Sequence, residues 1–123
     1  MPIVLIVDDN LLNLELAADV LELSDFEVIT AASGREGIQQ AEQHRPDLIL
    51  MDLRMPEMSG MEAMLELHAN PLTSNIPVAV LTASAMIGDA ERLVSSGFTA
   101  YLQKPIDPSS FAEQVSALLP ADH

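Results

Sequence analysis

The chain has 123 residues, 49% of them hydrophobic, which suits one domain with a buried core and leaves no room for a second. Its formal net charge of −14 and its few aromatic residues (3 Phe, 1 Tyr) exclude a basic or base-stacking surface, so we expect no direct nucleic-acid partner. The absence of cysteine excludes disulfides, thiolate metal sites and cysteine nucleophiles.

The first predicted unit is a strand followed by a helix. Ile3–Val7 (IVLIV) is apolar without alternation, which is typical of a strand buried on both faces of a parallel sheet. Asn10 is a suitable N-cap for a helix over Leu11–Leu23. The apolar residues of this helix predict a core-facing stripe of Leu12, Leu16, Val20 and Leu23, widened by Leu14, Ala17, Ala18 and Leu21.

The later strands and helices alternate in the same way. Further strands are predicted at Glu27–Ala31, Leu48–Met51 (LILM), Val78–Leu81 (VAVL) and Ala100–Gln103. Two Ser-x-x-Glu capping-box patterns mark helix starts, Ser33 with Glu36 and Ser59 with Glu62. The first of these helices should stop before Pro46, and the second covers Met61–Leu67.

Two more helices complete five strand–helix units. One is expected over Gly88–Ser95 and is closed by Gly97. Asp107 and Pro108 are a cap and a first-turn proline for the other, over Ser109–Leu119. Alternating strands and helices of these lengths predict an α/β fold with a doubly wound parallel sheet and right-handed crossovers.

The hydropathy and the two ends of the sequence indicate the cellular compartment and the number of domains. No apolar run approaches the ~18 residues of a membrane span, and Met1-Pro2-Ile3 lacks the basic region of a signal peptide. We therefore expect a cytoplasmic protein with no membrane partner. Residues 1–123 are expected to form one domain without an output domain, because the tail Pro120–His123 is too short to be one.

Reactive side chains follow four of the five predicted strands. They are Asp8 and Asp9 after the first, Asp52 after the third, Thr82 after the fourth and Lys104-Pro105 after the fifth. Because ligands of doubly wound sheets bind beyond the carboxyl ends of the strands, these groups should share one edge. Three carboxylates, one hydroxyl and the only lysine of the chain would then converge.

Three neighbouring carboxylates repel one another, and a hard divalent cation resolves that conflict. Mg²⁺ takes oxygen ligands, retains several waters and needs few protein carboxylates. An aspartate can act as a nucleophile toward a phosphoryl group, and phosphoryl transfer depends mainly on positioning and charge neutralisation. The constellation therefore predicts Mg²⁺-dependent phosphorylation of an aspartate, with Lys104 balancing phosphate oxygens and Thr82 donating to them.

Four motifs give the sequence a close resemblance to the receiver domain of bacterial response regulators over essentially its whole length. They are LIVDDN (Leu5–Asn10), PDLILMDLRMPEMSG (Pro46–Gly60), VAVLTAS (Val78–Ser84) and YLQKP (Tyr101–Pro105). Their order and spacing match together. The stretch AMIGDAERLVSSGFTAYLQKPID looks most like receivers of hybrid sensor kinases and of stand-alone cell-cycle regulators.

The resemblance implies a flavodoxin-like fold of five βα units with strand order 2-1-3-4-5. It implies that Asp52 is the phosphoacceptor and that Asp8, Asp9 and the backbone carbonyl of Arg54 contact Mg²⁺, for which Mn²⁺ could substitute. The resemblance further implies that Thr82 and Tyr101 form a switch pair and that Lys104 contacts the phosphate. It also implies a cis peptide bond between Lys104 and Pro105.

The resemblance also implies partners and an output. The phosphoryl donor would be a histidine kinase or a histidine phosphotransfer protein. A downstream protein target would bind the fourth helix, fifth strand and fifth helix. Such a switch is not an enzyme beyond catalysing its own phosphorylation and dephosphorylation. Two departures, Arg54 beside the acceptor and Ser84 two residues after Thr82, leave the lifetime of the phosphorylated state open.

Other interpretations remain open at this point. The chain can be a natural stand-alone regulator or a receiver excised from a hybrid kinase. A Mg²⁺-dependent phosphohydrolase with an aspartyl intermediate would use similar chemistry, but its nucleophile follows the first strand in a D-x-D pattern, where this chain has Asp8-Asp9-Asn10. A pseudo-receiver that only binds partners would show degenerate acidic or lysine positions, and none is degenerate here.

Overall fold

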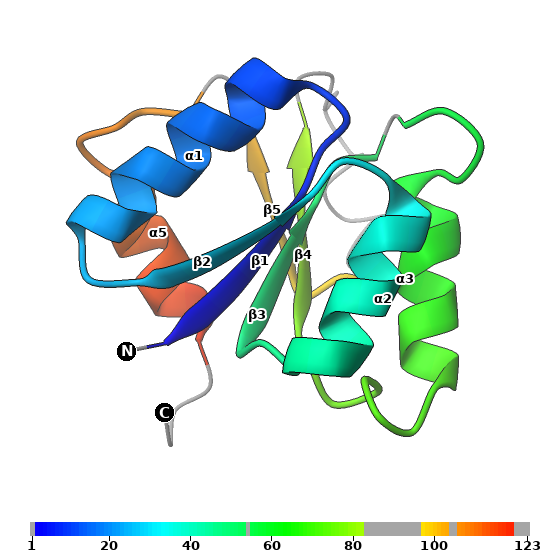
Figure 1. The fold of residues 1–123 in the computed structure, drawn as a ribbon. Helices are drawn as coiled ribbons and strands as arrows, with labels where there is room; N and C mark the ends of the chain where they lie inside the picture. The colour runs from blue at the N-terminus through cyan, green and yellow to red at the C-terminus, as the bar shows by residue number, and fades with distance from the viewer. Residues whose placement is uncertain (1, 54, 83–96, 104–105, 120–123) are drawn as a thin grey trace.

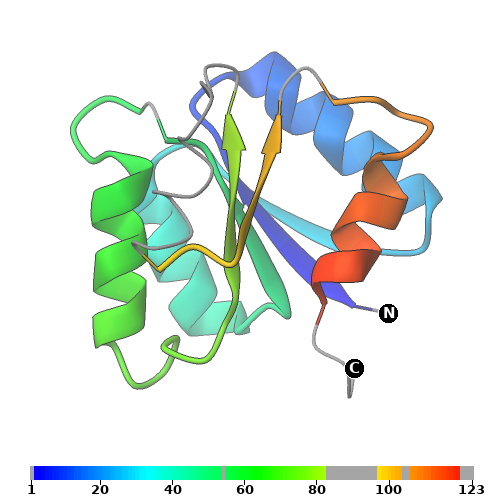
Figure 2. The same ribbon diagram turned by 180° about the vertical axis from the view of Figure 1, so that it is seen from behind.

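Short runs of apolar and β-branched residues form one parallel sheet. The computed structural model describes residues 2–53, 55–82, 97–103 and 106–119 (Figures 1 and 2). Its strands are β1 (Ile3–Val7), β2 (Glu27–Ala31), β3 (Leu48–Met51), β4 (Val78–Thr82) and β5 (Ala100–Gln103). Their spatial order is β2-β1-β3-β4-β5, all neighbours parallel, which confirms the predicted flavodoxin-like topology.

Helices cover both faces of the sheet (Figures 1 and 2). They are α1 (Leu11–Leu23), α2 (Gly34–His44), α3 (Gly60–Ala69) and α5 (Phe111–Leu118). The helices α1 and α5 lie on one face, and α2 and α3 lie on the other. The helix predicted over Gly88–Ser95 falls outside the described residues. None of the helices in the described ranges is long and apolar enough to cross a membrane.

The sheet separates two hydrophobic cores. Consecutive residues of β1 alternate between them, so that Val4 and Ile6 pack toward α1 and α5, while Leu5 and Val7 pack toward α2 and α3. All four side chains are buried. This two-sided burial explains why β1, β3 and β4 are apolar without alternation.

The predicted caps of the first three helices are present, with one difference in detail. The Asn10 side chain accepts a hydrogen bond from the Asn13 amide, 3.1 Å away. A complete capping box opens α3, since Ser59 and Glu62 each accept from the other's amide. At α2 the Glu36 carboxylate accepts instead from the Ala32 amide, one residue before the cap. These caps satisfy amides that the first helical turn leaves without partners.

The core-facing stripe predicted for α1 is right in its wider part and wrong in most of its leading residues. The helix buries Leu14, Ala17 and Leu21 against the sheet. Of the four leading residues, Val20 packs partly buried against the core, whereas Leu12, Leu16 and Leu23 are 77%, 46% and 87% exposed. A leucine-rich helix offers two stripes of similar hydropathy, and the small Ala17 lets the helix backbone approach the sheet on the side that is buried.

The predicted start of the last helix is also wrong. Asp107 does not cap α5; its carboxylate accepts from the amide and the hydroxyl of Ser109 at 3.0 and 2.7 Å and holds a turn over residues 108–110. The helix begins at Phe111, which is fully buried, and its N-cap Ser110 makes no side-chain cap bond. Asp-Pro-Ser-Ser satisfies its own backbone locally, and that turn competes with a longer helix.

Candidate metal and phosphoacceptor site

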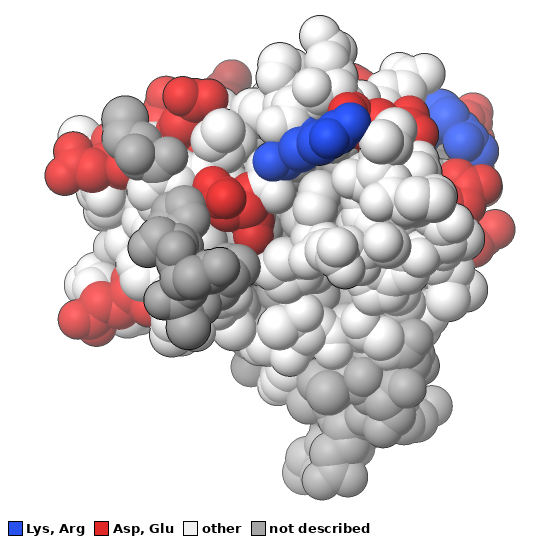
Figure 3. Space-filling model, turned by 90° about the horizontal axis from the view of Figure 1, so that it is seen from below, with Lys and Arg blue, Asp and Glu red and all other residues white. Residues whose placement is uncertain are grey.

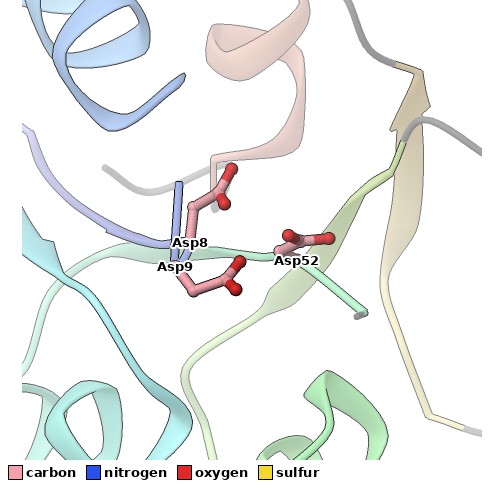
Figure 4. A group of neighbouring side chains, drawn as sticks. All are labelled: Asp8, Asp9 and Asp52. Atoms are coloured by element: carbon pink, nitrogen blue, oxygen red, sulfur yellow. The ribbon is translucent and has the colours of Figure 1, made fainter. Parts of the chain in front are cut away.

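Three carboxylates meet at the carboxyl ends of two neighbouring strands (Figure 4). Asp8 and Asp9 follow β1, and Asp52 follows β3. One carboxylate oxygen from each of the three lies within 4.8 Å of the others. The sequence-predicted acidic site is therefore assembled by strand order, because β1 and β3 are adjacent although their residues are far apart in the chain.

Backbone hydrogen bonds that continue the sheet hold the site residues in place. The Asp52 amide donates to the Val7 carbonyl at 2.9 Å, and the Asp8 amide donates to the Ala31 carbonyl at 3.0 Å. Asp8 and Asp52 are thus each the first residue beyond a strand and are still hydrogen-bonded to the neighbouring strand. This fixes the direction in which the side chains leave the sheet.

The three carboxylates differ in burial. Asp8 is 1% and Asp52 is 8% exposed, whereas Asp9 is exposed to solvent. The Asp8 carboxylate accepts a hydrogen bond from the Asn10 amide at 2.9 Å, which links the site to the start of α1. Carboxylates this close together repel one another, and a cation bound between them lowers that repulsion, so the donor set is suited to a metal ion.

The loop after Asp52 packs closely against that residue, a feature that sequence reasoning missed. The Gly60 amide donates to the Leu53 carbonyl at 3.0 Å. A Cβ on Gly60 would overlap the carbonyl oxygen of Asp52 and lie 3.0 Å from the Leu53 Cα. The signal in the sequence was a glycine at the first helical position after the Ser59 cap, where most residues are tolerated.

The other predicted site residues are placed in part. Thr82 ends β4 and pairs with Gln103 of β5, which brings its backbone to the predicted edge. Tyr101 pairs with Val80 and is half-buried against the core between the sheet and α2 and α3. Arg54, Lys104, Pro105 and Ser84 lie outside the described residues, and so does the predicted cis bond between Lys104 and Pro105.

Comparisons with known proteins agree with this geometry. The family model described as "Response regulator receiver domain" matches residues 4–116. The polar-differentiation response regulators DivK of Brucella anthropi and Brucella ovis are each 44% identical over 116 residues, covering 94% of both chains.

Solved structures give the same result. The chemotaxis response regulator CheY4 of Vibrio cholerae superposes with a TM-score of 0.89 at 29% identity, covering 97% of this chain and 99% of its own. A putative response regulator from Chloroflexus aurantiacus has a TM-score of 0.86 at 32% identity, with 95% and 96% covered.

Proposed function

Because this chain belongs to the response regulator receiver domain family of two-component signalling, we propose that it is a switch controlled by phosphorylation of Asp52. The observation that carries the proposal is the cluster of Asp8, Asp9 and Asp52 at the ends of two adjacent strands. Asp8 and Asp52 are its buried members, and Asp52 is the one delivered by the central strand β3.

The donor set fits a small, hard divalent cation. Ligand oxygens on an octahedral Mg²⁺ ion lie about 3 to 4 Å apart, which is compatible with carboxylate oxygens within 4.8 Å of one another. We infer that Asp9 and Asp52 would hold Mg²⁺ or Mn²⁺ directly, Asp8 partly through water, and that the Arg54 carbonyl is a further ligand. When bound, the cation supplies charge neutralisation for the incoming phosphoryl group.

Besides the divalent cation, the phosphoryl transfer requires only this chain and a phosphoryl donor. A carboxylate oxygen of Asp52 attacks phosphorus as the phosphorus–nitrogen bond of a donor phosphohistidine breaks, and the histidine nitrogen keeps that bond's electron pair. Lys104 would balance the phosphate oxygens and Thr82 would donate a hydrogen bond to them. The chain catalyses its own phosphorylation and dephosphorylation and turns over no other substrate.

The donor is proposed to be a histidine kinase or a histidine phosphotransfer protein. Such a donor must bring its histidine up to Asp52 and therefore must cover the neighbouring surface. Leu11 and Leu12 begin α1 within three residues of Asp9 and are 65% and 77% exposed. Leu16 continues this apolar surface along the helix. We infer that this leucine face contacts the phosphoryl donor.

The output surface is proposed to be the fourth helix, β5 and α5. Tyr101 is half-buried on β5, one strand away from Thr82 at the end of β4. When phosphate draws the Thr82 hydroxyl inward, space opens that the Tyr101 ring can fill. This gives two states with different contacts, which a few kcal/mol suffice to exchange.

Phosphorylation of Asp52 is tested by intact mass after incubation with phosphoramidate and Mg²⁺. The wild-type chain should gain one phosphoryl group, and Asp52→Asn should gain none. Asp9→Ala should bind Mg²⁺ more weakly and label more slowly. The matched control is Asp25→Asn, which removes an exposed charge at a left-handed residue (φ 69°) where asparagine is tolerated. Robust labelling of Asp52→Asn would reject the acceptor.

The switch is tested by amide chemical shifts with and without a beryllofluoride phosphate mimic. We expect changes across residues 86–98 and 100–111, beyond the immediate surroundings of Asp52. Tyr101→Ala should shrink the distant changes and leave those at Asp52 in place. Changes confined to the acidic site would mean that no signal reaches this face, and changes centred on α1 would move the output there.

A further inference from the structure

The outer edge of β2 has no strand beside it among the described residues. β2 comes first in the sheet order and pairs with β1 alone. The Glu27 amide donates to the Pro2 carbonyl, and the Ala31 carbonyl accepts from the Asp8 amide. Because backbone direction alternates along a strand, Val28 and Thr30 direct their amides and carbonyls outward. An edge of this kind can accept an added strand.

A groove of about 390 Å³ runs along this edge, between α1 and β2. Leu14, Ala18 and Val28 contribute its apolar lining. Val28 packs toward the α1 face of the sheet, and Thr30, two residues on, lines the same groove. The α1–β2 groove therefore lies directly beside the backbone groups that an added strand would pair with.

The helical wall of the α1–β2 groove is acidic. Glu15, Asp19 and Glu22 line it, at a spacing of four and three residues that places them in one row. Among the described residues, no lysine or arginine lines the groove, and the first basic residue of the sequence is Arg35. In Figure 3 the left side, where α1 turns into β2, shows only acidic side chains among the charged ones described, and the basic ones lie toward α2.

We propose that the α1–β2 groove binds an extended, basic segment of a partner protein, added as a strand along β2. Side chains of an added strand alternate between the two faces of the sheet. Those on the α1 face would lay aliphatic stems on Leu14 and Ala18 and bring cationic heads to the carboxylates, as arginine and lysine do. Those on the other face would meet Ile29, which packs toward the α2 side and favours apolar residues.

The charge of the groove selects this occupant over a second copy of the chain. Two copies that each carry a net charge of −14 would repel at an edge that is itself acidic. Nucleic acid is disfavoured on the same ground. A cationic segment gains from the long-range field of the whole molecule and from the three carboxylates at contact.

The proposal is tested with a blocked hexapeptide of alternating arginine and valine, titrated into the isotopically labelled full chain. Amide shifts should centre on residues 11–22 and 28–30, with hydrogen exchange slowed at Val28 and Thr30. Affinity should fall as salt rises. A peptide with glutamine in place of arginine should bind about tenfold more weakly or not at all.

Two sets of variants separate strand addition from general attraction. The triple variant E15Q/D19N/E22Q should bind the peptide about tenfold more weakly. Its matched control removes three exposed charges elsewhere, through Glu57→Gln, Glu66→Gln and Glu113→Gln, and should bind within about twofold of wild type. Thr30→Pro deletes an outward amide without touching the bonds to β1, and should weaken binding about tenfold.

Several results would overturn the proposal. Equal losses in the triple variant and its matched control would reduce the binding to bulk charge. Full affinity in Thr30→Pro would exclude strand addition. Loss of binding in Asp52→Asn would place the peptide at the acidic site. Concentration-dependent shifts of the same amides without peptide would make a second copy the occupant.

Discussion

Gly60→Ala should displace the phosphoacceptor Asp52 through a steric clash with its backbone. The new methyl group would overlap the Asp52 carbonyl oxygen and lie 3.0 Å from both the Asp52 carbonyl carbon and the Leu53 Cα. Backbone atoms at the end of a buried strand cannot relieve a clash by changing rotamer, as a side chain can. Either α3 or the strand end must therefore move.

Gly34 provides a matched control, because it also begins a helix directly after a serine cap. The three atoms nearest to a methyl group there all belong to the Met58 side chain, at 3.0 to 3.3 Å. A methionine can adopt another rotamer. Both substitutions gain about 0.5 kcal/mol because alanine restricts the unfolded chain. The two variants therefore differ mainly in what the added methyl group contacts.

The expected magnitudes follow from that difference. Overpacking that shifts backbone costs about 1 to 3 kcal/mol, so Gly60→Ala should lose about 1 to 2 kcal/mol of unfolding free energy. With a urea slope of about 2 kcal/mol/M, the midpoint should fall by about 0.5 to 1 M. Gly34→Ala should stay within about 0.3 M of wild type.

Phosphorylation kinetics give the second measurement. A displacement of a few tenths of an ångström at a reacting carboxylate lowers the rate by about tenfold. Labelling of Gly60→Ala by phosphoramidate, followed by mass, should slow by that factor, while Gly34→Ala should label normally. A Gly60→Ala protein with wild-type midpoint and wild-type labelling would show that the contact with Asp52 constrains neither folding nor the site.

Two further predictions concern the corrected elements. Leu21→Ala should lower the free energy of unfolding by about 2 to 5 kcal/mol, whereas Leu23→Ala should change it by less than about 0.5 kcal/mol; urea unfolding of both variants checks which stripe of α1 is buried. Hydrogen bonds from the side chain and, as the second cause, the backbone of Ser109 lower the pKa of Asp107. The ionised carboxylate therefore stabilises the turn at pH values above the pKa of Asp107 in the unfolded chain, and this stabilisation is lost as pH falls through the pKa of Asp107 in the folded protein. A carboxyl NMR titration should find that Ser109→Ala moves this pKa up toward its usual value, and an unchanged titration would contradict the bond.

The strands and the acidic site could be predicted because each depends on a short, local pattern. Runs such as LILM at Leu48–Met51 are typical of a strand buried on both faces, and this strand was found with the predicted bounds. The convergence of Asp8 and Asp9 with Asp52 needed only the rule that parallel strands share a carboxyl edge. Neither step required knowledge of side-chain packing.

The buried face of α1 could not be read from its leucines alone, because they surround the helix. The acidic residues carried the missing information. Glu15, Asp19 and Glu22 mark one solvent-facing row, and the residues opposite that row include Ala17 and Leu21, which are buried. Charged residues resist burial more strongly than leucines resist exposure, so they define the orientation of a leucine-rich helix.

The start of α5 illustrates a different limit. Asp107 and Pro108 form a valid cap pattern, but the same aspartate can satisfy Ser109 within a turn. The helix begins at Phe111, whose side chain is fully buried. Such a choice depends on contacts with residues distant in sequence, which a local pattern does not contain.

The three faces of α1 lead to partners that differ in their response to salt. One face is core, the exposed face with Leu12 and Leu16 begins beside the acidic site, and the third forms the acidic wall of the α1–β2 groove, which Leu11 also lines. Apolar contacts change little with ionic strength, whereas salt screens the attraction to exposed carboxylates, with a Debye length of about 8 Å at physiological ionic strength. A phosphoryl donor bound to the leucine face should therefore keep its affinity as salt rises, while a basic segment in the groove should lose it. Because the two surfaces lie on different sides of one helix, Leu12→Ser should weaken the first partner alone, and E15Q/D19N/E22Q the second alone.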